Sequence, residues 1–370
     1  MSGRIRLAFI LPHFRPGGAE RVVLNYLRAL DRERFEPFLF LALREGAFLD
    51  LVPEDVIVAD LGGARARRLP GRIARALAGH RIHAAYSATD AANLALLASR
   101  WFGARRTLRI VSVHTTPSSW LAEAKHPRLR RWLMRRLYPA AALVAVPAEA
   151  IAAELKQLGI PATVLPNPVI DAVLTAGHPA ERPLRIVAAG RLVEAKGFDL
   201  LIDAAAKLSG EFQLAIHGEG PLRDALSRQV AERDLGERLT LPGHSEPAAI
   251  FEGADLCVVP SRREGFGNVV VEAMAAGVPV LAAACPGPAA LIEHGHNGFL
   301  VEPGSSASLA EAMAALMRDP DRRRAVVDAA GRTAKRFEVH AATRELEAAL
   351  ERLLGKDRPA KHPDPGQALR

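Results

Sequence analysis

The sequence is poor in the residues that would place it in several large protein classes. It has only two cysteines, Cys257 and Cys285, so no disulfide framework is expected and a reducing compartment is favoured. No run of eighteen uncharged apolar residues occurs, which argues against a membrane-spanning helix. The short apolar stretch near Met1 lacks a small-residue cleavage site, so we interpret it as a first strand and not as a signal peptide.

Aromatic residues are also scarce, at 5% of the chain, and charge is unevenly distributed. Residues 1–182 contain 26 Lys+Arg and 15 Asp+Glu, a net charge of +11, whereas residues 183–370 contain 23 and 26, a net charge of −3. The first half is therefore expected to bind an anionic partner. Because aromatic residues are not interleaved with the basic ones, no nucleic-acid partner is expected and a membrane surface is favoured.

Strand-like apolar runs alternate with helix-like segments along both halves of the chain, which predicts an α/β protein with parallel sheets. The length of 370 residues is long for one core and comfortable for two. The sequence predicts a Rossmann-like domain over 1–168, a linker over 169–182 and a second Rossmann-like domain over 183–336. A helix is expected over 337–355, which either stays with the second domain or crosses back to the first, and a disordered tail over 356–370. Two doubly wound domains are thus expected to face each other across a cleft.

The stretch most indicative of function follows a strand-like run that ends at Pro260. A short helix is predicted from Asn268, as its N-cap, to Ala276. Glu264 would then lie in a loop at the carboxyl end of a strand and Glu272 in the next helix, where open parallel sheets bind ligands. Alternatively, Glu272 only favours the helix N-terminus electrostatically and Glu264 is solvated.

A pair of basic residues, Arg191 and Lys196, follows the first strand of the second half, flanked by Gly190 and Gly197. A forked guanidinium and a point-charged ammonium five residues apart suit a diphosphate. The alternative is an ordinary solvated basic loop.

Other strand ends of the second half are rich in glycine. The turn Gly218-Glu219-Gly220 either cradles a phosphate or only makes a tight corner. His244 follows another strand and is expected to line a base pocket and not to bind a metal, since no second ligand lies at suitable spacing. With the two carboxylates and the cation pair, these features predict a nucleotide-sugar site.

The motifs of both halves resemble those of family 4 of the retaining glycosyltransferases, which have the GT-B fold. Glu264 and Glu272 match the E-x7-E motif of that family, and Gly190-Arg191-Leu192 with Lys196-Gly197 matches its G-R-L-x3-K-G motif. Further matches are the glycine loop Gly17-Gly18-Ala19-Glu20-Arg21, the strand end Ser112-Val113-His114, the hinge Asn167-Pro168-Val169 and the turn Gly295-His296-Asn297-Gly298. There are two departures: Ile170 precedes the Asp of the hinge, and no Glu follows shortly after Gly287.

The resemblance implies a role for each matching residue. Arg191 and Lys196 would bind the diphosphate and stabilise it as a leaving group, Glu264 would contact the donor sugar, and His114 would face the anomeric centre or the acceptor. The donor-binding residues that it implies are Gly17, Gly18, Gly190, Gly218, Gly220, His244, Gly265, Phe266, Gly267, Asn268 and Glu272. For His114, the alternative is a structural histidine at a strand end.

The resemblance also implies a reaction, the retaining transfer of a hexose or N-acetylhexosamine from a nucleotide sugar to a lipid-linked or cell-envelope glycan. UDP is the favoured carrier. No metal or other cofactor is expected, because the cation pair supplies the positive charge and the leaving phosphate oxygen accepts the proton in a front-face mechanism. A nucleotide-sugar epimerase of GT-B-like fold and a non-catalytic basic adaptor remain as alternatives. A retaining glycosidase is disfavoured, since two carboxylates on one loop and helix straddle a bond awkwardly.

A basic segment, Lys125–Tyr138, is predicted as an amphipathic helix on which Leu129, Trp132, Leu133 and Leu137 share one face. A basic helix that carries Trp suits an anionic membrane surface. We therefore expect a cytoplasmic protein, peripheral on the inner face of the cytoplasmic membrane. The alternative is a surface helix that packs its leucine face on the sheet.

Overall fold

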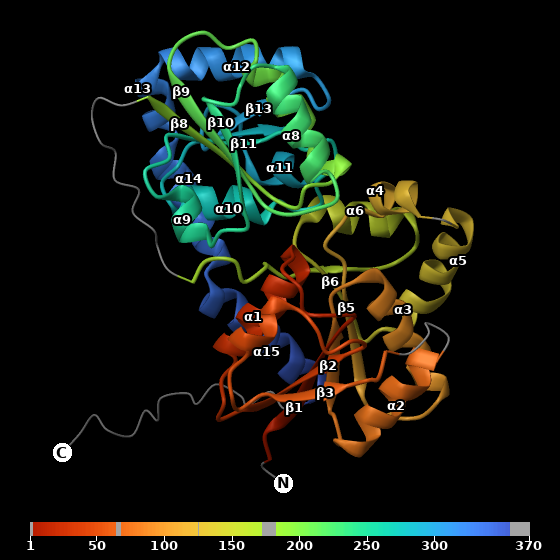
Figure 1. Cartoon of the computed structure of the whole chain (residues 1–370). Coiled ribbons are helices and arrows are strands. Elements are labelled where there is room, and N and C mark those ends of the chain that lie inside the picture. Colours follow the sequence, from red (N-terminus) through yellow and green to blue (C-terminus); the bar gives the residue numbers. More distant parts are fainter. Residues whose placement is uncertain (1–2, 64–67, 125, 172–182, 356–370) are drawn as a thin grey trace, which may run out of the picture.

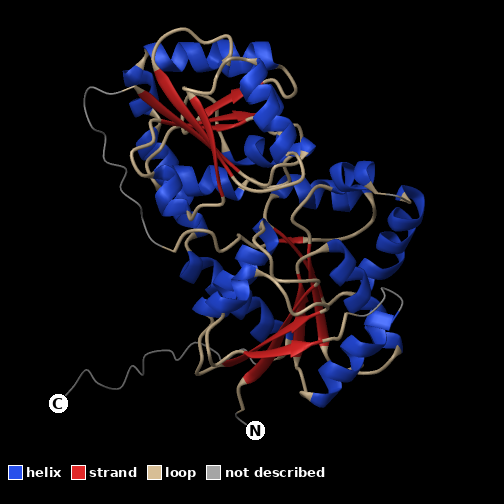
Figure 2. Ribbon diagram, viewed as in Figure 1, coloured by secondary structure: helices blue, strands red, loops and turns tan. Residues whose placement is uncertain are grey.

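The computed structural model describes residues 3–63, 68–124, 126–171 and 183–355. Within these residues the chain forms two parallel sheets, one in each half (Figure 1). Helices flank each sheet, which gives two α/β units stacked end to end (Figure 2). The predicted α/β architecture with two parallel sheets is confirmed.

The first sheet has seven strands in the order β3-β2-β1-β4-β5-β6-β7. The strands are β1 (Ile5–Leu11), β2 (Phe35–Leu41), β3 (Ile57–Asp60), β4 (Ala84–Ser87), β5 (Leu108–Ser112), β6 (Leu143–Val146) and β7 (Thr163–Val164). The helices are α1 (Gly18–Ala29), α2 (Leu69–Gly79), α3 (Asp90–Ala98), α4 (Pro117–Glu123), α5 (Pro127–Leu137) and α6 (Glu149–Gln157), with 3-10 turns η1 (Ala47–Leu51), η3 (Ser99–Trp101) and η4 (Tyr138–Ala140). The winding direction reverses between β1 and β4, which opens a crevice at their carboxyl ends.

The second sheet has six strands in the order β10-β9-β8-β11-β12-β13. The strands are β8 (Leu184–Ala189), β9 (Phe212–His217), β10 (Leu239–Gly243), β11 (Leu256–Val259), β12 (Val280–Ala283) and β13 (Phe299–Val301). The helices are α7 (Phe198–Ala205), α8 (Arg223–Glu232), α9 (Pro247–Phe251), α10 (Asn268–Ala275), α11 (Pro286–Leu291), α12 (Ser306–Arg318), α13 (Pro320–Ala325), α14 (Val327–Ala334) and α15 (Val339–Leu353), with η5 (Glu194–Lys196) and η6 (Lys335–Phe337). Here the winding reverses between β8 and β11, so the crevice lies beside the loops that carry the basic pair and Glu264.

The strands read as continuous apolar runs because helices cover both faces of each sheet. All four residues of β11 are buried, as are all four of β12. At the centre of the first domain, Phe9 packs between Tyr26 and Tyr86, with ring centroids 6.0 and 5.4 Å away. These packed layers form a rigid base for the loops at the strand ends.

The chain passes between the domains twice, and the two passages pair with each other. The main-chain N–H groups of Val169 and Ile170 donate to the Phe337 carbonyl, and that of Val339 donates to Ile170. Ile170, one of the two departures from the family motif, is buried in the core of the second domain. Ile170 therefore anchors the hinge in the second domain.

The last helix, α15, lies on the first domain against α1 (Figure 1). Leu346 and Leu350 enter the core of the first domain, and the buried Glu347 accepts a hydrogen bond from the Asp31 N–H. From residue 172 onward the predicted linker lies outside the described residues, and so does the whole of the predicted tail over 356–370.

Local differences from the prediction concern short elements. The helices α4, α9 and α11, of five to seven residues, were not predicted. The prediction of Asn268 as an N-cap was wrong: Gly267, at φ +94°, is the N-cap of α10, and Asn268 is its first helical residue. No helix among the described residues is long and apolar enough to cross a membrane.

Candidate functional site

The basic pair and Glu264 meet at the carboxyl edge of the second sheet. The loop after β8 packs on the loop after β11 so tightly that a side chain at Gly197 would overlap the Pro260 carbonyl. This packing brings the Lys196 ammonium into an ion pair with the Glu264 carboxylate, 68 residues away along the chain. Ser261 Oγ donates to the same carboxylate oxygen at 3.3 Å. The side chain of Lys196 is 24% exposed and that of Glu264 is 13% exposed, so the pair is shielded but open to a ligand.

Arg191, the other member of the basic pair, is exposed in the same loop. Burial raises the pKa of Glu20, a buried carboxyl group of the first domain, and the positive charge of Arg191 is among the effects that oppose the rise. Arg191 therefore lies within electrostatic range of Glu20 and its glycine loop.

The glycine loop forms the N-terminus of α1. Gly17 is the N-cap and supplies no side chain to bond the first N–H groups, which suits an anion. The Glu20 carboxylate folds back toward Gly17, and His13 Nδ1 lies 3.8 Å from it. An acidic side chain thus lies beside the place where an anionic ligand would approach.

Three polar contacts join the two domains next to this loop. Arg21 donates to both carboxylate oxygens of Glu246, at 3.1 and 2.9 Å, while its guanidinium lies over the Phe48 ring. The Asn268 amide lies 3.5 Å from the Gly18 carbonyl and accepts from Asn167 of the hinge at 3.2 Å. Asn268 is therefore a bridge between the glycine loop and the hinge.

Glu272 follows on α10 and has an unusual ionisation. Its pKa is raised to about 7, mainly by burial and also by the nearby Glu246, while the positive charges of Arg21 and Lys196 act in the opposite direction. A carboxyl group that changes charge near neutral pH, in a crevice, is a candidate for ligand binding.

His114 approaches the Glu264 loop from the first domain. A side chain at Gly265 would overlap the His114 carbonyl oxygen and come within 2.5 Å of Thr115 Cα. Ser112 Oγ lies 3.1 Å from His114 Nε2, and burial lowers the pKa of His114 to about 4. His114 is therefore a neutral imidazole at physiological pH, placed where the domains touch.

Two of the glycines at strand ends donate their N–H groups to other main-chain carbonyls. The Gly190 N–H donates to the His217 carbonyl, and the Gly218 N–H donates to the Gly243 carbonyl. A side chain at Gly218 would overlap the Gly190 carbonyl, and one at Gly220 would overlap the loop at Leu192. These contacts favour the tight-corner interpretation of the Gly218–Gly220 turn over a phosphate cradle.

The other predicted donor-binding residues differ in their exposure and contacts. Phe266 is 3% exposed and packs edge-on against Phe337, so its side chain belongs to the core of the second domain. Gly267 supplies the left-handed turn before α10. His244 is exposed, with its Nε2 3.8 Å from Glu246.

No group of three or more His, Cys, Asp or Glu side chains suited to hold a metal occurs among the described residues. Asp319 and Asp321 have the spacing of an acidic metal-binding pair. However, Asp319 accepts from the Arg322 N–H at the start of α13, and Asp321 forms an ion pair with Arg324. Both carboxylates are thus engaged in contacts with residues of α13.

Comparisons with known proteins agree with this geometry. The family described as "Glycosyltransferase Family 4" matches residues 16–172, and "Glycosyl transferases group 1" matches residues 175–333. The 2-deoxystreptamine glucosyltransferase of Streptomyces kanamyceticus is 31% identical over 265 residues, which are 65% of this chain and 68% of that protein. The chain belongs to glycosyltransferase family 4.

Other relatives of this family 4 chain are matched over shorter stretches. The lipopolysaccharide core biosynthesis glycosyltransferase LpsE of Rhizobium meliloti is 34% identical over 142 residues, 38% of this chain and 41% of LpsE. The chain spans less than half the length of LpsE and of two further curated relatives, with shares of 41%, 45% and 33%.

Solved structures show the same fold. HepE of Anabaena in complex with UDP and glucose superposes with a TM-score of 0.81 at 24% identity, over 94% of this chain and all of HepE. The sucrose-phosphate synthase of Thermosynechococcus elongatus superposes with a TM-score of 0.81 at 20% identity, over 96% of this chain. The predicted GT-B fold, two facing Rossmann-like domains, is confirmed.

Several residues at the family 4 crevice were not singled out from the sequence, namely Glu20, Arg21 and Glu246. Glu20 and Arg21 lie inside the glycine-loop motif, so the motif itself could have pointed to them. Glu246 has no such motif, because its partner Arg21 is 225 residues away along the chain.

Proposed function

We propose that this chain is a retaining, metal-independent glycosyltransferase that moves a hexose or N-acetylhexosamine from a UDP-sugar to a lipid-linked or cell-envelope glycan. The observation that carries the proposal is the Lys196–Glu264 ion pair in the loop that also carries Arg191, at the crevice that faces the glycine loop of α1. Cations for a diphosphate and an acceptor for sugar hydroxyls thus lie side by side in one crevice.

Donor binding would rearrange the ion pair. The diphosphate would take the Lys196 ammonium and the Arg191 guanidinium, which leaves the Glu264 carboxylate to accept hydrogen bonds from the sugar. Bond breakage between the anomeric carbon and the phosphate oxygen places negative charge on the diphosphate, where these cations stabilise it. The acceptor hydroxyl attacks from the same face and its proton passes to the leaving phosphate oxygen. The neutral His114 imidazole, bonded to Ser112, would offer hydrogen bonds at this point without adding charge.

The test of the proposed function is product formation. The protein is incubated with UDP-sugars and GDP-sugars, lipid-linked glycans from bacterial membranes and a panel of octyl glycosides, with and without EDTA. We expect UDP release and a product in which the anomeric configuration of the donor is retained, unchanged by EDTA. A changed donor sugar without acceptor would support the epimerase alternative, and binding without turnover would support the adaptor.

The ionisation of Glu272 predicts a pH dependence of donor binding. Ribose hydroxyls donate to the ionised carboxylate, so affinity is full above the pKa of about 7 and is lost as pH falls through it. The Kd of UDP-glucose should rise by up to about tenfold for each pH unit below neutrality. Calorimetry between about pH 5.5 and 8.5 measures this, and UDP-glucose is suitable because its diphosphate does not titrate in that range. Glu272→Gln should bind more weakly at pH 8 and show no such slope; an equal slope in that variant contradicts the assignment.

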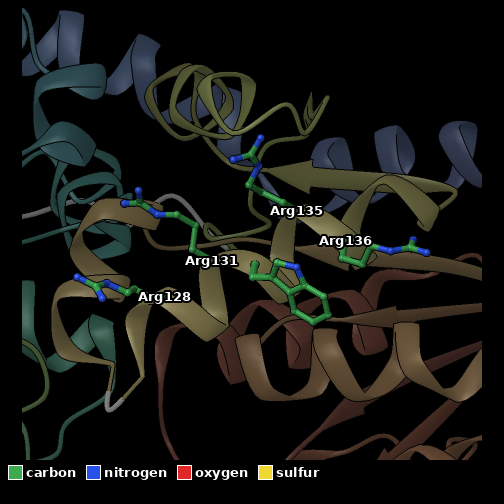
Figure 3. Close-up of a pocket in the computed structure, with 5 residues that line it drawn as sticks. Arg128, Arg131, Arg135 and Arg136 are labelled. Carbon is green, nitrogen blue, oxygen red and sulfur yellow. The ribbon is translucent and has the colours of Figure 1, made fainter.

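The second part of the proposal is that α5 docks on an anionic membrane surface. The residues of the predicted apolar face differ in burial, because Leu137 is buried whereas Leu129 and Trp132 are 53% and 59% exposed. The outer face has an open pocket of about 320 Å³ that is lined by Trp132 and by four arginines, Arg128, Arg131, Arg135 and Arg136 (Figure 3). Arginines around an exposed tryptophan suit phosphate headgroups with an apolar layer beneath them.

Removing charge from this face should weaken membrane binding. Each arginine near an anionic surface contributes about 1 kcal/mol, so Arg131→Gln with Arg135→Gln should lower the partition onto phosphatidylglycerol vesicles by about 30-fold. Vesicle co-sedimentation at low and high salt measures the change. The matched control is Arg228→Gln with Arg318→Gln, two exposed arginines of the second domain. Equal loss in both double variants would show that only net charge matters.

A further inference from the structure

We propose that Asp90, Arg130 and Trp120 form a subsite beside His114 that binds a neutral sugar of the acceptor, with the Asp90 carboxylate accepting hydrogen bonds from its hydroxyls. This inference rests on the proposed transferase function and names the part of the first domain that holds the acceptor. None of the three residues belongs to the motifs through which the chain resembles its family.

The register of the first sheet places Asp90 and His114 at the same level. The neighbouring strands β4 and β5 pair in parallel with Ser87 opposite Val111. Asp90 comes three residues after Ser87, beyond the carboxyl end of β4, and His114 comes three residues after Val111, beyond the carboxyl end of β5. The two residues therefore follow neighbouring strand ends at the same carboxyl edge of the first sheet.

A polar network fixes both strand ends. The buried Asn93 accepts from Ser87 Oγ at 2.6 Å and donates to the Ser112 carbonyl at 2.8 Å, with Tyr138 OH at 3.3 Å. Asn93 therefore ties the end of β4 to the end of β5. With its polar atoms engaged within the protein, it leaves ligand binding to Asp90 one turn earlier.

Asp90 is shielded, yet it keeps capacity to accept hydrogen bonds. One of its oxygens accepts from Arg130 at 3.0 Å, and its side chain is 18% exposed. Burial raises the pKa of Asp90 to about 6, and Arg130 opposes the shift, so the carboxylate is mostly ionised at neutral pH.

The third member of the subsite supplies an apolar surface. Arg130 lies over the Trp120 ring, with its guanidinium carbon 5.0 Å from the ring centroid. Trp120 is in α4, which starts three residues after His114, so the indole follows the end of β5 and the Asp90 carboxylate follows the end of the neighbouring β4. An ionised acceptor, an aromatic ring and a donor already committed to Asp90 suit a sugar ring and disfavour a free anion, which Asp90 would repel.

The test separates acceptor binding from donor chemistry. Asp90→Asn is nearly isosteric and removes the charge, so we expect the KM for the preferred octyl glycoside to rise at least tenfold. The KM for UDP-glucose and its slow hydrolysis without acceptor should change less than twofold. Glycoside binding in the presence of UDP is measured separately by saturation-transfer NMR. The matched control is Asp55→Asn, which removes an arginine-paired carboxylate from the opposite edge of the sheet.

The outcomes distinguish this inference from the proposed function. If wild-type protein transfers sugar and Asp90→Asn has the same acceptor KM, the subsite is overturned while the function stands. Parallel losses of acceptor use, donor hydrolysis and unfolding temperature would show a structural role for Asp90 and also overturn it. Absence of glycoside binding to wild-type protein rejects a neutral-sugar subsite, and absence of UDP-glucose binding rejects the proposed function first.

Discussion

Lys196→Ala is expected to lower kcat/KM by about a thousandfold, the largest effect of any single substitution in the crevice. The ammonium forms an ion pair with Glu264, and in the proposed reaction it stabilises the leaving diphosphate. Its removal takes away charge stabilisation and also leaves the Glu264 carboxylate with the hydrogen bond from Ser261 but without its cation. Steady-state kinetics with a UDP-sugar measure the loss, and calorimetry separates the share that is already present in donor binding.

The control for this variant is Lys207→Ala. Lys207 is an exposed lysine of the same domain whose ammonium lies 3.5 Å from Ser306 Oγ, so its loss should leave kcat/KM unchanged. Lys196→Arg keeps the charge but not the point geometry and should recover only part of the activity. A Lys196→Ala variant with more than a tenth of the wild-type activity would show that the diphosphate is held elsewhere.

Most of the architecture could be predicted because each sheet repeats one local pattern. Buried parallel strands give apolar runs, and the crossover helices between them give a 3.6-residue period. The elements missed, such as α4 and α9, are too short to show a period. The sequence placed Leu129 and Leu137, which lie about 80° apart around α5, on one face, but it did not reveal which part of that face is buried. In the structure Leu137 is buried, together with Met134.

The site residues could be predicted only where they lie close together in the sequence, within one motif. Arg191 and Lys196 share one loop, and Glu264 and Glu272 share one loop and helix, so their types and spacing already indicated phosphate and sugar binding. What could not be predicted were contacts between the domains, such as Arg21 with Glu246. Such contacts depend on how two separately folded units meet. The ionisation of Glu272 depends on them in turn, because Arg21 and Glu246 shift its pKa in opposite directions.

A tight contact between the domains, at Gly265, decides whether the crevice can close. On one side, a side chain at this position would overlap the His114 carbonyl and approach Thr115 Cα to 2.5 Å. On the other side, Gly287 packs so closely that a side chain there would lie 2.6 Å from the main chain of Phe266. The Glu264 loop is thus held between two backbones and cannot retreat from a methyl group. The domains themselves must move apart.

Gly265→Ala should therefore lower kcat/KM by about a hundredfold or more, since a shift of about 1 Å between reacting groups has that effect. Neither hydrophobic core is touched, so the unfolding temperature should change by only a few degrees. The matched control is Gly236→Ala, at a position where an added Cβ would have nothing within 4 Å. We expect donor hydrolysis to gain relative to transfer, because a crevice that closes poorly admits water. Wild-type kinetics in Gly265→Ala would mean that His114 and Glu264 do not act together in a closed crevice.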